Sequence, residues 1–414
     1  MISSKPVRGT RDIKPDEMLV RDQLEQVILS TYRDHGFNRI ETPVTENIDL
    51  LLGSEGGENL KMLFTILKRG NKFQPSEEST VRDLCDIGLR YDLTLPLSRF
   101  YANNEQALEM PFKAIQIGNV FRAERPQKGR YRSFKQCDID IIGEASHVAE
   151  MELISTTSEA LLAIGFKDFN IKINDRRLLT AFILKAGFKA EDIGSICISL
   201  DKIDKIGIDG VSQELVDKGN DVNQVHDFMD QISKITLDNL DTYIDLPEVT
   251  KNLKHIIEVS ETLAKGRYRI TFEFTLIRGM GYYTGTVFEV AYGEYASSIA
   301  GGGRYDHMIG KYSKSSVPAV GFSIGFERIV NILMEDGSAA IESAKNRTAL
   351  FYHPQKDGMI RVFEMAESLR KQGQQVTLMI AKKKVGKQIQ HCEEKGYTSF
   401  MIFGQDNELR VFNE

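Results

Sequence analysis

Residues 121–143 read FRAERPQKGRYRSFKQCDIDIIG, a charged loop followed by a strand with regular alternation. Every second position of that strand is polar or aromatic: Phe134, Gln136, Asp138 and Asp140. The positions between them are apolar: Cys137, Ile139 and Ile141. Because successive strand residues point to opposite faces, the pattern predicts one buried face and one polar face. On periodicity alone, a polar face of this kind is more often solvated than functional.

A second strand precedes the loop. Residues 111–124, PFKAIQIGNVFRAE, have strand character, so the two strands predict a long antiparallel hairpin. From residue 122 to residue 135 there is a single acid, Glu124. The basic residues in the same segment are Arg122, Arg125, Lys128, Arg130, Arg132 and Lys135. The whole chain has a net charge of −6, which argues weakly against nucleic acid. The hairpin loop is therefore a local positive segment on an acidic protein.

The chain on either side of the hairpin predicts a mixture of helices and strands. Before the hairpin we predict a helix over 16–35, closed by Gly36, and the extended run FNRIETPV (37–44). After it we predict a helix from a Ser146 cap to Gly165, and short helices over 176–265 with gaps at Gly187, Gly210 and Gly219. Strands within 268–292, the glycine cluster 301–303 and a helix over 325–336 follow. Pro43 in the extended run suits a sheet edge or an interface. The short helices have the character of an insertion.

The last part of the chain has a composition of its own. After the small and polar segment 337–347, strands are predicted at 348–353, 375–380 and 398–403. The helices between them have apolar faces formed by Met359, Val362, Phe363, Ala366 and Leu369, and by Val385, Ile389 and Cys392. Such alternation implies a small, mainly parallel sheet. Four lysines gather at the start of the second helix, Lys382, Lys383, Lys384 and Lys387; a solvated helix face explains them as well as RNA contact does.

Composition excludes several classes of protein. With 41% hydrophobic and 27% charged residues among 414, the chain is typical of globular proteins and long enough for two or three domains. We find neither an apolar stretch long enough to span a bilayer nor a signal-peptide core, so we expect a cytoplasmic protein without membrane contact. The four cysteines are far apart and form no CxxC pair, which argues against structural zinc and against a disulfide framework.

Phosphate binding would have to use arginine, because the sequence contains neither a Walker loop nor a GxGxxG turn between a strand and a helix. A planar guanidinium donates two parallel hydrogen bonds to a phosphate and keeps its charge. Three arginines stand beside glycine or aromatic residues at strand ends: Arg122, Arg278 and Arg328. Taken singly, Arg122 beside Glu124 or Arg328 beside Glu327 is as readily a surface ion pair.

Together these stretches resemble the class II aminoacyl-tRNA synthetases along essentially the whole chain. HGFNRIETPV (35–44) is similar to motif 1, residues 121–143 to motif 2, and AVGFSIGFERI (319–329) to motif 3. Three further stretches resemble the histidyl-tRNA synthetases in particular: RGMGYYTGTVFE (278–289), AGGGRYD (300–306) and LRYDLTLPLSRF (89–100). The resemblance implies an enzyme that activates histidine with ATP and esterifies it onto tRNA(His).

The resemblance also implies roles for individual residues. The ATP-binding residues would be Arg122, Glu124, Arg130, Phe134 and Arg328, with arginines on the phosphates, Glu124 on the adenine amino group and Phe134 stacked on the base. The histidine-binding residues would be Asp92, Thr94 and Gln136 at the amino end, Asp140, Tyr282, Tyr283 and Tyr305 around the imidazole, and Arg278. Arg278 would be the central catalytic residue, assisted by Arg122 and Arg328. Many histidyl enzymes carry an acid at the position of Gly281, so the support of Arg278 differs here.

Three further expectations concern partners. Mg²⁺ would accompany ATP, although no residue can be assigned to it. The acceptor stem of the tRNA would meet Gln127, Lys128 and Arg130 in the hairpin loop, and a carboxyl-terminal RNA contact would use Lys383, Lys384 and Lys387. Motif 1 implies a homodimer whose interface includes Pro43.

The fold implied is an α+β catalytic domain: an antiparallel sheet flanked by helices, with a helical insertion and a small α/β anticodon-binding-like domain. We predict the catalytic domain at 1–175 and 263–336, the insertion at 176–262, a linker at 337–346 and the last domain at 347–414. One alternative is a synthetase-like regulatory subunit of ATP phosphoribosyltransferase, whose relatives lose ATP-contacting residues and the last domain. Another is a catalytically inactive RNA-binding or signalling module, which would leave the histidine signatures unexplained.

Overall fold

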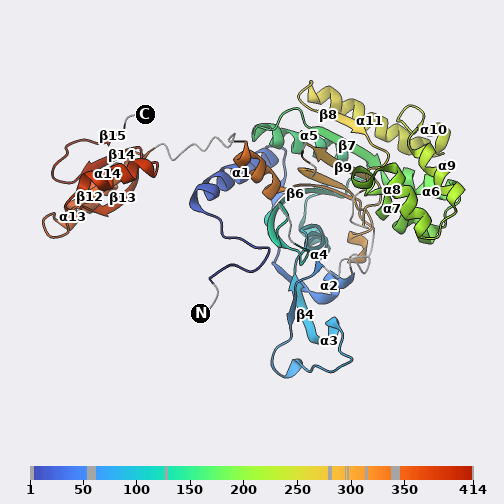
Figure 1. Ribbon diagram of the computed structural model, residues 1–414, viewed down its shortest axis with the longest axis horizontal. Coiled ribbons are helices and arrows are strands. Elements are labelled where there is room, and N and C mark those ends of the chain that lie inside the picture. Colours follow the sequence, from blue (N-terminus) through green and yellow to red (C-terminus); the bar gives the residue numbers. More distant parts are fainter. Residues whose placement is uncertain are drawn as a thin grey trace. The chain divides into compact units, whose positions relative to one another are not determined.

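The computed structural model describes residues 4–53, 62–125, 129–277, 282–293, 295, 298–312, 316–336 and 346–412. The chain forms two compact units, Met1–Glu335 and Asp336–Glu414 (Figure 1). Each unit has a sheet and a hydrophobic core of its own.

Within the described ranges, the large sheet of the first unit has eight strands in the order β1-β5-β6-β11-β10-β9-β7-β8. Their bounds are Asn38–Arg39 for β1, Phe112–Phe121 for β5, Ser133–Ile142 for β6, Ala319–Ile324 for β11, Ala300–Arg304 for β10, Thr286–Ala291 for β9, Asn170–Asp175 for β7 and Arg269–Phe272 for β8. Neighbours from β5 to β7 are antiparallel, and β1 and β8 add a parallel strand at each edge. The predicted antiparallel sheet flanked by helices is thus confirmed, with parallel edges in addition.

The predicted hairpin is formed by β5 and β6, which pair without a bulge. On one side of β6, Lys135 contacts Glu25 of helix α1 (Pro15–Asp34), so this side faces the helices. The polar side is buried as well: Asp138 is 4% exposed and Asp140 is 2% exposed. The interpretation as a solvated face is therefore wrong for this strand.

The helix layer on the Lys135 side is centred on α5 (Val148–Ala163), which packs on β6 and β11. Helices α1 and α11 (Pro247–Ala264) both pack against α5, and α12 (Phe326–Glu335) packs against β6 (Figure 1). Helix α1 buries a regular stripe formed by Val20, Leu24 and Ile28, as an amphipathic helix on a sheet does.

The predicted cap of α5 is wrong. The helix begins at Val148, so the N-cap residue is His147 and not Ser146. The His147 side chain makes no hydrogen bond to the start of the helix. Ser146 is occupied elsewhere, because its amide donates to Glu144 Oε1 at 2.7 Å and its carbonyl accepts from Arg304 at 3.2 Å.

On the opposite side of the sheet, α4 (Thr94–Asn104) packs with Phe112 and Ile142 in one core cluster. A three-stranded sheet, in the order β2-β4-β3, lies in the same part of the chain. Its strands and the short helices around them are β2 (Thr45–Asn47), α2 (Ile48–Gly53), β3 (Thr65–Leu67), α3 (Val81–Leu84) and β4 (Cys85–Leu89).

Between β7 and β8 the chain is helical, as predicted. The helices before α11 are α6 (Arg176–Lys185), α7 (Ile193–Leu200), α8 (Ile203–Asp217), α9 (Val222–Ile232) and α10 (Leu240–Tyr243). Gly187 and Gly219 lie between helices, with φ of 88° and 94°. The predicted gap at Gly210 is wrong: this glycine lies inside α8, and the break in helical geometry falls at Gly207, with φ 72°.

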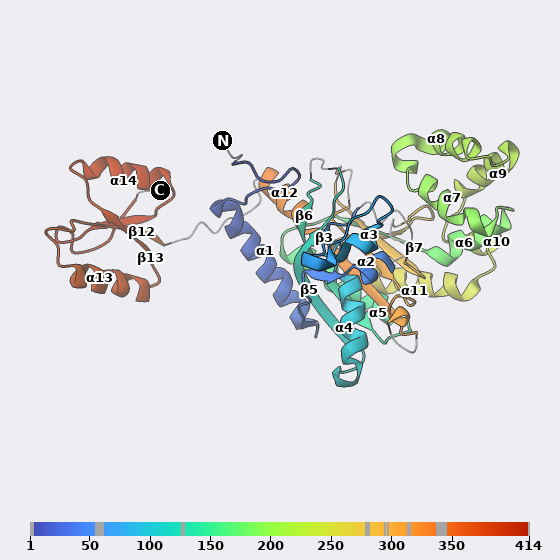
Figure 2. The ribbon, with the colours of Figure 1, turned by 90° about the horizontal axis from the view of Figure 1, so that it is seen from below.

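The second unit contains the parallel sheet predicted for it. Strand β12 (Arg347–Tyr352) pairs in parallel with β13 (Gln375–Ile380) and β14 (Ser399–Ile402), and β15 (Arg410–Val411) adds an antiparallel edge. Helices α13 (Met359–Lys371) and α14 (Val385–Glu394) cover opposite faces (Figure 2). The apolar face predicted for α13 is partly wrong, because Val362 is buried whereas Phe363 is 54% exposed.

Candidate active site

A cavity of about 430 Å³ lies on the polar side of the large sheet. Strands β6, β10 and β11 contribute residues to it, and every predicted ATP- or histidine-binding residue that the structure describes lines it. From the ATP set these are Arg122, Glu124, Arg130, Phe134 and Arg328. From the histidine set they are Asp92, Thr94, Gln136, Asp140, Tyr282, Tyr283 and Tyr305. Residues far apart in sequence are thus brought to one place.

The arginine end of the cavity is built by the hairpin and by α12. Arg122 follows β5 and donates from Nε to the Tyr91 carbonyl at 3.0 Å, which fixes its guanidinium. The same guanidinium lies 5.1 Å from the centre of the Phe134 ring, on β6. Arg328 is held by a hydrogen bond from Nη1 to the Ser298 carbonyl. Two cations and an aromatic ring at one end suit phosphates and a base.

Glu327, beside Arg328, links α12 to α1. Its carboxylate accepts from Arg21 in bidentate geometry, at 2.8 and 2.6 Å. Hydrogen bonds and ion pairs from Arg21 and Arg11 keep the pKa of Glu327 below its usual range although burial raises it. Sequence reasoning treated Glu327 only as a pairing partner for Arg328; its ion pair with Arg21, 306 residues away, had no signal in the sequence.

The opposite end of the cavity is acidic and aromatic. Tyr305 donates from its hydroxyl to Asp140 Oδ1 at 2.6 Å. Asp92, just before α4, accepts from the Leu95 amide at 3.1 Å. The Tyr282 ring centre lies 4.8 Å from that of Tyr283 and 6.1 Å from that of Tyr305. Carboxylates among aromatic rings are suited to a nitrogenous cation.

Three aspartates share this end of the cavity, and their pKa values are raised. Burial, mainly, raises the pKa of Asp92 to about 6 and that of Asp140 to about 7. Burial and the charge of Asp140 raise the pKa of Asp138 well above its usual value. Asp138 lies on the predicted polar face but was not assigned a role. The positive charge of a cationic ligand would favour the ionised carboxylates and so oppose the burial and mutual repulsion that raise these pKa values.

Three acceptor oxygens in this cavity are buried and have no hydrogen-bond partner among the described residues: Asp92 Oδ2, Gln136 Oε1 and Asp140 Oδ2. A buried acceptor without a donor costs about 1–3 kcal/mol, so native proteins rarely keep one without a reason. All three accept and none donates. A ligand that presents several N–H groups would satisfy them together.

The bare backbone of β10 and β11 gives these side chains room. Asp140 lies opposite Gly321, where an added Cβ would stand 2.0 Å from Asp140 Oδ1. At Gly302 an added Cβ would stand 2.0 Å from the Gly321 carbonyl. Gly302, from the glycine cluster at 301–303, therefore allows the backbones of β10 and β11 to lie close together beside the cavity.

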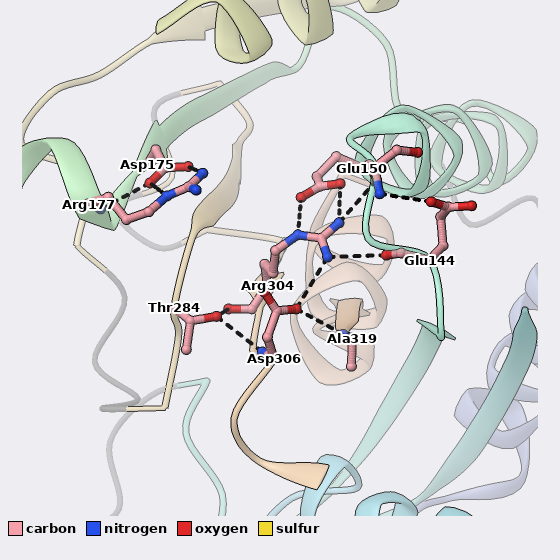
Figure 3. Close-up of polar contacts among 9 residues, drawn as sticks. Glu144, Glu150, Asp175, Arg177, Thr284, Arg304, Asp306 and Ala319 are labelled. Carbon is pink, nitrogen blue, oxygen red and sulfur yellow. Dashed lines mark hydrogen bonds and ion pairs between the residues drawn. The ribbon is translucent and has the colours of Figure 1, made fainter. Parts of the chain in front are cut away.

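Arg304 anchors the strand end that carries Tyr305 (Figure 3). It points from β10 to Glu150 on α5, with Nε and Nη2 each 2.6 Å from a carboxylate oxygen. The next acid, Asp306, accepts from the Ala319 amide at 3.0 Å. Neither Arg304 nor Glu150 was predicted from the sequence to have a role. Both are buried, and their pairing depends on the tertiary fold.

The structure leaves some predicted residues undescribed and places others in the second unit. Arg278 and the neighbouring Gly281 lie outside the described residues, as do Gln127 and Lys128 of the hairpin loop. Lys383, Lys384 and Lys387 are exposed and belong to the second unit, before and within α14. In the described ranges we find no cluster of three acids, histidines or cysteines placed to hold a metal ion.

An antiparallel sheet whose cavity has arginines at one end and buried acids among tyrosines at the other fits the class II aminoacyl-tRNA synthetases that the sequence resembles. The model of the family described as histidyl-tRNA synthetase matches residues 9–329. A histidine–tRNA ligase of Leifsonia xyli subsp. xyli is 39% identical, over 97% of this chain and 95% of that protein. One of Cytophaga hutchinsonii is 33% identical, over 96% and 92%. The chain belongs to the histidyl-tRNA synthetase family and is an aminoacyl-tRNA synthetase.

Solved structures agree on the fold. A histidyl-tRNA synthetase from Nostoc sp. has a TM-score of 0.77 and 26% identity, over 97% of this chain and 91% of that one. A structure from Bacillus halodurans described as an ATP phosphoribosyltransferase regulatory subunit/histidyl-tRNA synthetase also has a TM-score of 0.77, at 19% identity. That second likeness concerns the fold alone, so the regulatory-subunit alternative has no further support.

Along the described residues, no helix combines the length and the apolar character that a bilayer crossing requires.

Proposed function

We propose that the protein joins histidine to ATP, forming histidyl-adenylate and pyrophosphate, and then transfers histidine to the 3'-terminal adenosine of tRNA(His). The observation that carries this proposal is the set of unpartnered acceptors: Asp92 Oδ2, Gln136 Oε1 and Asp140 Oδ2. Histidine has an ammonium group with three N–H donors and an imidazole with a fourth. Its donors match in kind what the cavity lacks.

At the amino end, Asp92, Thr94 and Gln136 would hold the ammonium. At the far end, Asp140 would accept from an imidazole N–H while its other oxygen is held by Tyr305. Tyr282 and Tyr283 would complete the wall around the ring. Amino acids of similar size without ring nitrogens would leave Asp140 Oδ2 buried without a hydrogen-bond partner, and the pocket would reject them.

At the arginine end, Arg122 and Arg328 would bind the phosphates, Arg130 would assist, Glu124 would accept from the adenine amino group and Phe134 would stack on the base. The histidine carboxylate is already ionised when it attacks the α-phosphorus, so activation requires no general base. Negative charge then grows on the phosphate oxygens, and fixed guanidinium groups stabilise it. We assign Arg278 the central place in that step, with Arg122 and Arg328 beside it.

ATP would bring Mg²⁺, held mainly by phosphate oxygens with one or two carboxylates. Outside the histidine end, the cavity lining has the carboxylates of Glu124, Asp201, Glu289 and Glu327, so oxygen donors of the kind that this ion takes are present. For tRNA we propose Gln127, Lys128 and Arg130 at the acceptor stem, and Lys383, Lys384 and Lys387 as phosphate contacts. We also propose a homodimer and a cytoplasmic location.

The test is pyrophosphate exchange into ATP, measured with each of the twenty amino acids separately. We expect exchange with histidine alone. Exchange that responds to another amino acid, or a folded protein that shows none with histidine, would overturn the proposal.

A further inference from the structure

Ser323 of β11 lies directly opposite Asp138 of β6 and donates its hydroxyl proton to Asp138 Oδ1. Gln136 Nε2 lies 3.1 Å from the oxygen of the same hydroxyl. It is also 3.4 and 3.5 Å from the two Asp138 oxygens, at the limit of a hydrogen bond. Ser323 thus stands between a carboxylate and an amide.

The number of protons and lone pairs on Ser323 determines which atoms donate and which accept in the hydrogen bonds among Gln136, Ser323 and Asp138. A serine hydroxyl has one proton and two lone pairs. With Asp138 ionised, the proton of Ser323 is given to Asp138, and the oxygen of Ser323 can only accept from Gln136. The group of Gln136 that faces Ser323 must therefore be the NH₂ and not the carbonyl, and the carbonyl Oε1 is the atom left buried without a partner.

We infer that Asp138 and Ser323 are positioning residues that hold the Gln136 amide with its carbonyl oxygen toward the substrate ammonium. The inference rests on the proposed function, since it assigns an ammonium to that oxygen. Neither residue belongs to the set proposed to touch histidine. Their contribution is orientation: an amide turned by 180° would present NH₂ to a cation and repel it.

The consequence is selectivity for the amino end of the substrate. With the carbonyl held in place, only a ligand group that donates hydrogen bonds satisfies Gln136. A hydrogen bond to a charged group contributes about 1.5–3 kcal/mol, which corresponds to roughly 10–100-fold in affinity. Loss of the Ser323 hydroxyl should cost affinity of that order for ligands with an ammonium and nothing for ligands without one.

The experiment is calorimetric titration of the full chain with two probes. Histidinol keeps the ammonium and the imidazole, whereas imidazolepropionate keeps the imidazole but lacks the ammonium. In Ser323→Ala we expect histidinol to bind about 10–100-fold more weakly and imidazolepropionate to bind as in the unmodified protein. The KM for ATP in pyrophosphate exchange should not change.

Two further comparisons separate positioning from general damage. In a Gln136→Ala background, adding Ser323→Ala should cost nothing more, because the residue through which it acts is gone. Asp138→Asn keeps an oxygen that can accept the Ser323 proton, so its histidinol affinity should exceed that of Asp138→Ala. Asp140→Asn, at the imidazole end, is the matched control and should weaken both probes.

Additive losses in the double variant, or equal weakening of both probes by Ser323→Ala, would overturn the inference. So would Asp138→Asn and Asp138→Ala with the same histidinol affinity. If the unmodified chain binds neither probe, the proposed function itself fails, and this result is distinct from binding that Ser323→Ala leaves unchanged.

Discussion

At the scale of single residues, the carboxylate of Asp140 occupies space that any side chain on the opposite strand would fill. Gly321 is opposite it on the neighbouring strand, although the two residues are 181 positions apart in the sequence. If Asp140 binds the imidazole as proposed, histidine recognition requires the missing side chain at Gly321 as well as the carboxylate. A sequence reader sees a glycine and an acid, but only the strand register shows that they meet.

Gly321→Ala should raise the KM for histidine about tenfold or more in pyrophosphate exchange and leave the KM for ATP nearly unchanged. The added methyl would displace Asp140 from the place where it meets the imidazole, a loss on the scale of one hydrogen bond to a charged group. Gly194→Ala is the control, because no atom lies within 4 Å of the methyl added there. Equal KM values for histidine in the two variants would contradict the assignment.

Asp140 should also make stability depend on pH in the absence of histidine. Its folded-state pKa of about 7 is above the ordinary value of 3.8, so the neutral form stabilises the fold fully below about pH 4. That stability is lost as the pH rises through 7. Asp140→Asn should therefore be more stable than the unmodified protein at pH 8, on the order of 2–4 kcal/mol, and the difference should shrink toward pH 4. Urea unfolding across this range measures it; a difference that does not vary with pH would refute the expectation.

At the scale of elements, the sequence predicted the hairpin, the helix layer and the parallel second sheet because each has a periodic apolar pattern. It did not distinguish Gly207 from Gly210, since composition does not show which of two nearby glycines adopts a positive φ. The alternation in the sequence also placed Asp138 on the correct face of its strand, but it gave no sign that Asp138 pairs with Ser323. Ser323 is on another strand, and its pairing with Asp138 is a property of tertiary register.

The buried ion pair between Arg304 of β10 and Glu150 of α5 should be costly to break by removal of one partner. Arg304→Ala leaves Glu150 buried, so we expect a loss of about 3–5 kcal/mol in unfolding free energy. The KM for histidine should rise as well, because Tyr305 follows Arg304. Lys234→Ala breaks an exposed pair and should leave the urea midpoint unchanged. An Arg304→Ala midpoint equal to that control would show that the pair carries no stability.

At the scale of the whole molecule, the proposed chemistry belongs to the first unit and the proposed lysine contacts to the second. All cavity residues precede Asp336, and the second unit has its own sheet and two helix layers. Between Arg347 and Glu414 there are eleven basic and eight acidic residues, a net +3 on a chain of −6. Basic charge of this kind supports binding to phosphates without reading sequence.

A chain that stops at Ser343 should keep histidine-dependent pyrophosphate exchange and need a much higher tRNA concentration for charging. The salt dependence of tRNA binding should also flatten, because fewer phosphate contacts release fewer counterions. Aminoacylation at increasing tRNA concentration checks this. If the truncated chain charges tRNA as well as the full one, the second unit is not an RNA-binding domain.

The full chain should sediment as a dimer at micromolar concentration, through the region of residues 35–44. Strand β1, within that region, is at the edge of the large sheet, where an interface can form. Sedimentation velocity measures the mass directly. A monomer at that concentration would count against the interface.

The cysteines have a practical consequence. The chain has four, and Cys85, Cys137, Cys197 and Cys392 are all free and buried. A thiol reagent applied to the folded protein should thus label a newly introduced surface cysteine faster than any native one. One such residue on each unit, for example in place of Lys234 and of Lys371, would accept a pair of spin labels or fluorophores without prior removal of native thiols. The separation of the two units, with and without tRNA, could then be followed as a spectroscopic distance in an otherwise unaltered chain.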